Sequence, residues 1–106
     1  MKRIRDAGEK LARAIIVNFM NFSGELTVEK LQSHGWASVT FSGARHRIRL
    51  RLEGPGAGAE ADAFLAGLSE REFELRGHLL ADIFLVSEKR GEAVRLDLEA
   101  LTVEEC

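Results

Sequence analysis

The 106-residue chain contains a single cysteine, Cys106, at its last position. One cysteine cannot form a disulfide within the chain, so any bridge would join two chains. Proteins without a cysteine framework are typical of reducing compartments, and we therefore expect a cytoplasmic location. A hydrophobic core must hold the fold, and the chain is long enough to form one as a single domain over residues 1–106.

Long hydrophobic runs are also missing. No stretch approaches the roughly 20 consecutive apolar residues of a membrane-spanning helix, so we expect no membrane association. The basic start followed by apolar residues superficially resembles a secretion signal. However, Asp6 and Glu9 lie across the junction, Asn18 interrupts the apolar run, and no small-residue cleavage site follows. The sequence therefore favours an intracellular protein without a leader.

Aromatic residues make up 7% of the chain, and tyrosine is absent. Surfaces that bind single-stranded nucleic acid usually stack bases on aromatic rings, so this scarcity weighs against that function. The only proline, Pro55, lies in the glycine-rich segment Gly54–Ala59. The glycine spacing matches neither the dinucleotide-binding nor the P-loop pattern, and Glu60 and Asp62 would occupy the positive end of the following helix. We therefore interpret the segment as a connection and expect no cofactor.

The three histidines, His34, His46 and His78, are widely spaced, and none has another histidine or a cysteine within four residues. This spacing predicts no metal site. His34 lies near Trp36 at a predicted junction between two elements, where a small catalytic pocket could form. Ordinary partly buried or surface histidines are the simpler interpretation, so an enzyme is the least supported function.

The apolar residues that are present recur with clear periods. Helical spacing predicts an amphipathic helix over Ile4–Phe22, although the β-favouring residues of Ala14–Phe22 are also compatible with a strand. A second, short helix is predicted over Thr27–Gly35, with Thr27 as its N-cap and Gly35 just past its end. A third helix is predicted over Glu60–Leu68.

Alternation of apolar and polar residues predicts two hairpins. In the first, Trp36–Phe41 pairs through a turn at Ser42 and Gly43 with a strand that runs through Arg45–Leu52. In the second, a long strand beginning at Phe73 returns, after a turn at Arg90 and Gly91, as a strand from Val94. The sequence thus predicts an α+β fold: an antiparallel sheet of about four strands built from two β-hairpins, with two or three helices packed on it.

One predicted strand carries an arginine at every second position, and we call this set the arginine stripe: Arg45, Arg47, Arg49 and Arg51. Guanidinium groups about 6.6 Å apart along a strand suit phosphates or carboxylates, so an anion- or nucleic-acid-binding surface is one hypothesis. The alternative, which we favour, is a solvated face with cross-strand ion pairs to acidic residues of the same parity: Glu72, Glu74, Asp97 and Glu99.

The distribution of charge fits either interpretation. Residues 1–51 carry ten lysines and arginines against four acidic residues, whereas residues 52–106 carry five against thirteen. Two such halves either present separate basic and acidic surfaces or neutralise each other when they pair.

An apolar set on the second long strand leads to the preferred function. Leu80, Phe84 and Val86 are expected to face away from the core, where either the N-terminal helix or a second copy of the chain would cover them. We therefore expect a non-enzymatic protein-interaction module, for which self-association as a homodimer is a real option. The alternatives are anion or nucleic-acid binding by the arginine stripe, and a small enzyme with a pocket near His34 and Trp36.

Overall fold

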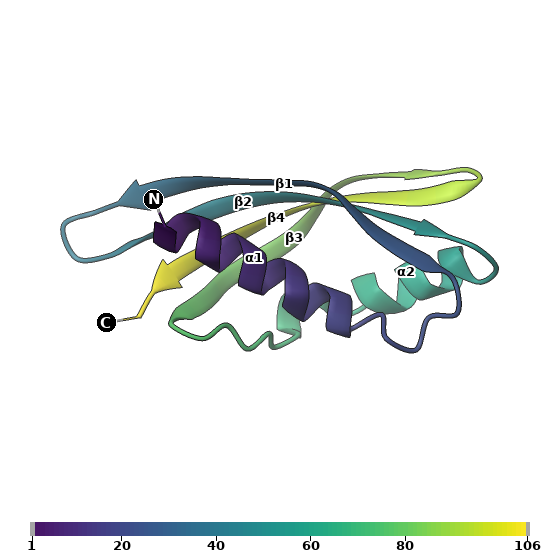
Figure 1. Cartoon of the computed structure of the whole chain (residues 1–106), viewed down its shortest axis with the longest axis horizontal. Coiled ribbons are helices and arrows are strands. Elements are labelled where there is room, and N and C mark those ends of the chain that lie inside the picture. The colour runs from purple at the N-terminus through teal and green to yellow at the C-terminus, as the bar shows by residue number, and fades with distance from the viewer. Residues whose placement is uncertain (1, 106) are drawn as a thin grey trace.

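The computed structural model describes residues 2–105. In chain order it contains two helix–hairpin units, with a short 3-10 helix inserted in the second (Figure 1). The elements are α1 (Lys2–Val17), β1 (Glu25–Ala37), β2 (Ser42–Glu53), α2 (Ala57–Leu65), η1 (Leu68–Glu70), β3 (His78–Arg90) and β4 (Ala93–Glu104).

The four strands form one antiparallel sheet in the order β1-β2-β4-β3. Each hairpin forms one half of the sheet, and the halves join where β2 pairs with β4. Both helices lie on the same face of the sheet (Figure 1), which we call the inner face. The predicted α+β fold of two hairpins with helices packed on their sheet is therefore confirmed.

The core lies between the inner face and the helices. Because side chains alternate across a strand, β2 buries Ile48, Leu50 and Leu52 while its arginines point the other way. Helix α1 contributes Leu11 and Ile15, four residues apart on one face of the helix, and Phe19 adds a third buried side chain from the turn that follows. Burial of each such side chain stabilises the fold by about 1.5–3 kcal/mol.

The turn after α1 meets α2 at Phe19 and Phe64. Their rings lie 4.8 Å apart between centroids and are tilted by 38°. Phe64 is buried on α2, and Phe19 follows the last residue of α1 in a turn that continues the helical direction. The Ala14–Phe22 segment is therefore helical up to Val17 and then a turn, and it is not a strand. The contact closes one end of the core.

The predicted helix over Thr27–Gly35 is wrong, because these residues belong to β1. A β-bulge between Val28 and Lys30 explains the error. It inserts one extra residue, so Val28 and Leu31 fall on the inner face three positions apart, a spacing typical of a helix. A strand with a bulge thus imitates helical periodicity.

The first hairpin turn also lies earlier in the chain than predicted. Ser38 donates its backbone N–H to the carbonyl of Phe41 at 2.7 Å, and Phe41 N–H donates to Ser38 Oγ at 3.1 Å. The predicted strand Trp36–Phe41 is therefore mostly turn, and the predicted turn at Ser42 and Gly43 is the start of β2. Val39 in this turn is fully exposed.

Two further boundaries differ from the predictions. The third helix occupies Ala57–Leu65, a few residues earlier than predicted, and begins after Gly56, whose φ of 82° suits glycine. The second long strand begins at His78 and not at Phe73. No helix in residues 2–105 combines the length and apolar character required to cross a membrane.

Candidate functional site

The face of the sheet opposite the helices, here called the outer face, is covered by no other element of residues 2–105. Its side chains alternate with those of the core along each strand. Charged residues occupy its middle and one end, and apolar residues occupy the other end. The central charged side chains come from β2 (Arg45, Arg47, Arg49, Arg51) and β4 (Arg95, Asp97, Glu99).

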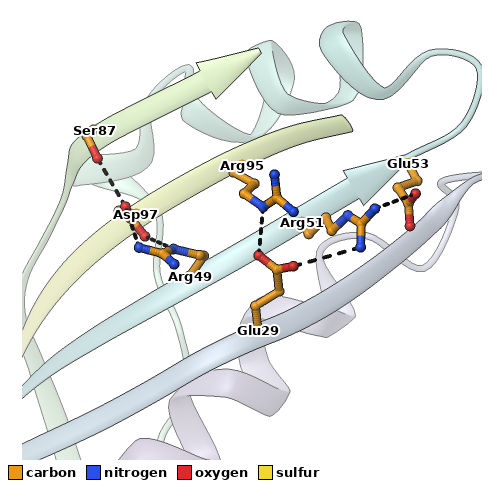
Figure 2. Close-up of polar contacts among 7 residues, drawn as sticks. All are labelled: Glu29, Arg49, Arg51, Glu53, Ser87, Arg95 and Asp97. Carbon is orange, nitrogen blue, oxygen red and sulfur yellow. Dashed lines mark hydrogen bonds and ion pairs between the residues drawn. The ribbon is translucent and has the colours of Figure 1, made fainter. Parts of the chain in front are cut away.

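Two arginines of the stripe pair directly with carboxylates of β4. Arg47 Nε donates to Glu99 Oε1 at 3.0 Å, and Arg49 Nε donates to Asp97 Oδ1 at 2.8 Å. Ser87 of β3 adds a hydrogen bond to Asp97 Oδ2 at 3.1 Å, as Figure 2 shows. The hydrogen bond from Arg49 lowers the pKa of Asp97 below its ordinary value, and Asp97 in turn raises the pKa of Arg49. The carboxylate of Asp97 is therefore held charged between three strands.

Arg51 and Arg95 lie directly opposite each other on β2 and β4, which brings two like charges together. Glu29 at the β1 bulge reaches over both of them (Figure 2): Arg95 Nε donates to its Oε1 at 2.9 Å, and Arg51 Nη1 lies 3.9 Å from its Oε2. Glu53 accepts a further hydrogen bond from Arg51 Nη2 at 2.9 Å. Two carboxylates thus offset the repulsion between the two guanidinium groups.

Arg45 at the end of the stripe is the least engaged. Its Nε lies 4.0 Å from Glu99 Oε2, and its side chain is 62% exposed. The four arginines therefore stand on one face as predicted, but three of them already donate hydrogen bonds to carboxylates. An anion that bound these three arginines would have to compete with the carboxylates.

The carboxylates that pair with the stripe are partly those expected from the sequence. Asp97 and Glu99 lie opposite it as predicted, whereas Glu72 and Glu74 lie before β3 and take no part in the sheet. Glu29 was missed because its segment was predicted to be a helix. Its position at a bulge, opposite a basic strand, becomes evident only once β1 is known to pair with β2.

The other end of the outer face is apolar. The register places Trp36, Gly43, Val103 and Leu79 in one row across the four strands. A Cβ atom on Gly43 would lie 2.9 Å from Trp36 Cζ2, so the indole ring packs over this glycine. Trp36 Nε1 is buried and has no hydrogen-bond partner among the described residues.

Strand β3 continues this apolar surface along the edge of the sheet. Leu79 is 55% exposed, Phe84 43% and Val86 42%. Phe84 lies opposite Glu99, so it points to the outer face as predicted. Because both helices pack on the inner face, α1 does not cover Phe84, and Val86, the extra residue of the bulge between Leu85 and Ser87, is exposed as well.

The expectation that Leu80 faces away from the core is wrong. Leu80 is half-buried and packs against the core, whereas its neighbour Leu79 is exposed. A bulge between Leu80 and Asp82 changes the parity of the strand at this point, so Leu80 and Phe84 lie on opposite faces. The apolar set exposed on β3 is therefore Leu79, Phe84 and Val86.

A buried polar network lies under β1, β2 and β4. Ser33 Oγ lies 2.7 Å from His46 Nδ1, and His46 Nε2 lies 2.9 Å from Thr102 Oγ1, which donates to the carbonyl of Ala44 at 3.4 Å. Because the Thr102 hydroxyl donates its proton to the carbonyl of Ala44, His46 Nε2 must donate to Thr102 Oγ1. His46 Nδ1 then accepts a hydrogen bond from the Ser33 hydroxyl. Burial, followed by the charge of His78, lowers the pKa of His46 to about 4. His46 is therefore neutral at physiological pH.

The region near His34 contains a groove of about 620 Å³ between α1 and β1. His34 and Ser33 line this groove, but Trp36 does not. Ser33 and His46 have the spacing of a nucleophile and its base, but two observations oppose that role. A Cβ atom on Gly8 would lie 2.6 Å from Ser33 Oγ, so the helix backbone packs on the hydroxyl. A histidine with a pKa of about 4 is also a weak base.

The described residues include no cluster of three or more histidine, cysteine, aspartate or glutamate side chains that could hold a metal ion. Comparison of the chain with protein-family models, curated proteins and solved structures finds no match. The case for a function therefore depends on the surfaces described above.

Proposed function

We propose that this chain is a non-enzymatic protein-interaction module that associates with a second copy of itself through the apolar residues of β3. One observation carries the proposal: Leu79, Phe84 and Val86 are 42–55% exposed on an edge strand, and within residues 2–105 the helices pack on the inner face of the sheet and leave the outer face open. Exposed apolar groups concentrated on one element of a small protein are typical of a contact surface. A symmetric dimer is the most common assembly for such a surface.

The charged middle of the outer face limits where the contact can form. Packing of two outer faces directly on each other would remove the pairs Arg49–Asp97 and Arg47–Glu99 from water, and the loss of hydration would oppose association. The edge on β3 avoids this cost, since its apolar side chains lie beside the ion pairs. We therefore place the contact at the edge of the sheet.

The test is the mass of the protein in solution as a function of concentration. Sedimentation velocity from about 10 μM to about 1 mM, the range of weak transient interfaces, should show a reversible monomer–dimer equilibrium. Phe84→Ser should weaken it. Val39→Ser is the matched control, because Val39 is an exposed apolar residue in the distant hairpin turn. All samples carry Cys106→Ser, which prevents disulfide-linked dimers.

A constant monomer mass up to about 1 mM would overturn the proposal. Association with a Kd above about 1 mM would be too weak to attribute to a specific interface. Equal weakening by Phe84→Ser and Val39→Ser would also contradict it, because the effect would then be a general consequence of lost surface hydrophobicity. Circular dichroism on each variant confirms that the fold is retained.

A further inference from the structure

The sheet has two open edges, β1 and β3, and they differ in chemistry. On β1 the exposed side chains are polar or charged, including Glu29, Lys30 and Gln32. On β3 they include Phe84 and Val86. No backbone hydrogen bond joins the free side of β3, over residues 79–90, to another segment within the described chain. Unpaired backbone groups beside exposed apolar side chains favour the addition of another strand.

Strand β3 also carries two unpaired charges. Asp82 near its start and Lys89 near its end are exposed, and within residues 2–105 neither has a hydrogen-bond or ion-pair partner. Their situation contrasts with the neighbouring outer face, where Asp97, Glu99, Arg47 and Arg49 are all paired. Both charges point to the outer face, because Asp82 lies opposite Leu101 and Lys89 lies opposite Arg95.

These observations distinguish between the two directions of self-pairing. Two parallel copies of β3 in register would place Asp82 beside Asp82 and Lys89 beside Lys89, which is repulsive. Two antiparallel copies place the start of one strand beside the end of the other. Such a pair has twofold symmetry, so one complementary contact occurs twice.

We infer that two copies of the chain join edge to edge through antiparallel β3 strands, with Asp82 of each copy opposite Lys89 of the other, which forms a continuous eight-stranded sheet. This inference rests on the proposed self-association and specifies its geometry. In this register Phe84 lies opposite Ser87 of the second copy, and both point to the outer face. The contact also places a carboxylate beside Lys89, which lies opposite the like charge of Arg95 across the sheet.

The bulges of β3 set the extent of the contact. They lie between Leu80 and Asp82 and between Leu85 and Ser87, so the regular stretch between them is Asp82–Leu85. The proposed register pairs this stretch with residues 86–89 of the second copy. A strand contact of this length buries little surface, and the dimer should therefore be weak and reversible.

The test exchanges the two charges between copies. Asp82→Lys alone places two lysines opposite each other twice, and Lys89→Asp alone places two aspartates opposite each other twice. Each single variant should raise the Kd of dimerisation by at least about tenfold. An equimolar mixture of the two variants should restore association, because both contacts are again between opposite charges. Sedimentation equilibrium with one variant carrying a fluorophore measures the heterodimer directly.

Two features make this test specific. Asp82 and Lys89 are seven residues apart on one strand, about 23 Å, so recovery in the mixture cannot arise within one chain. Glu25→Lys is the matched control for the other edge, since Glu25 is exposed on β1. It should leave the Kd unchanged within about twofold.

The outcomes separate this geometry from the proposed function. If the parent protein dimerises but the mixture does not recover, the β3 register is wrong while self-association stands. If Glu25→Lys weakens the dimer and the β3 variants do not, the contact uses the β1 edge and the inference is overturned. If the parent protein stays monomeric to about 1 mM, self-association and its geometry both fail.

Discussion

His46 of β2 and Thr102 of β4 are joined by a hydrogen bond of 2.9 Å from Nε2 to Oγ1, in a part of the core where both side chains are completely buried. The two residues belong to different hairpins, so the bond crosses the junction between the two halves of the sheet. Ser33 extends the network to β1, and Gly8 of α1 packs on its hydroxyl. One helix and three strands are therefore linked through a single imidazole ring.

The neutral state of His46 predicts that stability falls in mild acid. The folded pKa is about 4, whereas an unfolded histidine titrates near 6.5, so the unfolded chain binds the proton first as pH falls. The associated stability is fully present above about pH 6.5 and is lost progressively towards pH 4. The expected loss in the free energy of unfolding is about 3 kcal/mol, measured by urea denaturation at several pH values.

His46→Gln provides the control for this prediction, because the slope between pH 6.5 and pH 4 should be strongly reduced in a variant without the imidazole. Asp97 contributes mostly below this window, because its pKa is lowered from the ordinary value of an aspartate. NMR titration of the folded parent protein should independently give an imidazole midpoint near 4 for His46. A midpoint near 6.5 would contradict the prediction.

Gly8 and Ser33 should be energetically coupled. In an isolated helix, alanine is favoured over glycine by about 1 kcal/mol, so propensity alone predicts that Gly8→Ala is stabilising. The added Cβ would lie 2.6 Å from Ser33 Oγ, which His46 holds in place, and we expect a net loss of about 1–3 kcal/mol.

A double-mutant cycle measures this coupling. Ser33→Ala alone should cost about 1 kcal/mol through the lost hydrogen bond. In that background Gly8→Ala should cost less, by about 1 kcal/mol or more, because the oxygen in the way is gone. Two results would contradict the coupling: stabilisation by Gly8→Ala alone, or strict additivity of the two changes in the free energy of unfolding. Either would show that the helix moves away from Ser33 without loss of stability.

Local periodicity was sufficient to predict most of the fold. Strand β2 is regular, so Ile48, Leu50 and Leu52 alternate strictly with arginines and the sequence predicts both of its faces. Strand β1 is interrupted at Glu29, and the inner positions on the two sides of the bulge then have a helical spacing. A bulge is stabilised by pairing with a distant strand, so a single-segment pattern does not reveal it.

The candidate surfaces were also predictable in part: the sequence predicts which residues share a face of a strand, but not which strand lies beside it. The position of the arginine stripe follows from the period of β2, but its partners depend on which strand lies beside it. The adjacency of β2 and β4 arises from long-range pairing, and this brings Asp97 and Glu99 opposite the stripe. On β3 the bulge after Leu80 reverses the parity, so Leu79 is exposed and Leu80 is not. The exposure of Phe84 and Val86 was predicted from the sequence alone.

Glu29→Gln should destabilise the protein by about 1 kcal/mol, because it leaves Arg51 and Arg95 opposite each other with less negative charge nearby. The loss should shrink at high salt, which screens repulsion between exposed charges. Glu25→Gln on the same strand is the matched control, and thermal unfolding at low and high salt measures both. Equal effects of the two substitutions would indicate that the position of Glu29 between the arginines contributes nothing.

Arg71 links the end of α2 to Asn18, the residue that follows α1. We expect the stability of the protein to depend on its guanidinium group. Its Nη2 donates to the carbonyls of Ala63 and Phe64 at 3.2 Å and 3.0 Å, and its Nη1 donates to Asn18 Oδ1 at 3.0 Å. The guanidinium carbon also lies 5.4 Å from the centre of the Phe64 ring. These carbonyls belong to the last turn of α2, where a cation is favoured by the helix dipole.

We expect Arg71→Met to lower the free energy of unfolding by about 1–2 kcal/mol, since it keeps the apolar stem but removes the donors. Arg71→Lys should recover little of this loss, because a lysine ammonium lacks the planar fork that serves α1 and α2 together. Hydrogen exchange should show faster opening of α2 in both variants, with β2 and β4 unchanged. If Arg71→Lys were as stable as the parent protein, charge at the end of α2 would account for the effect and the link to Asn18 would contribute nothing.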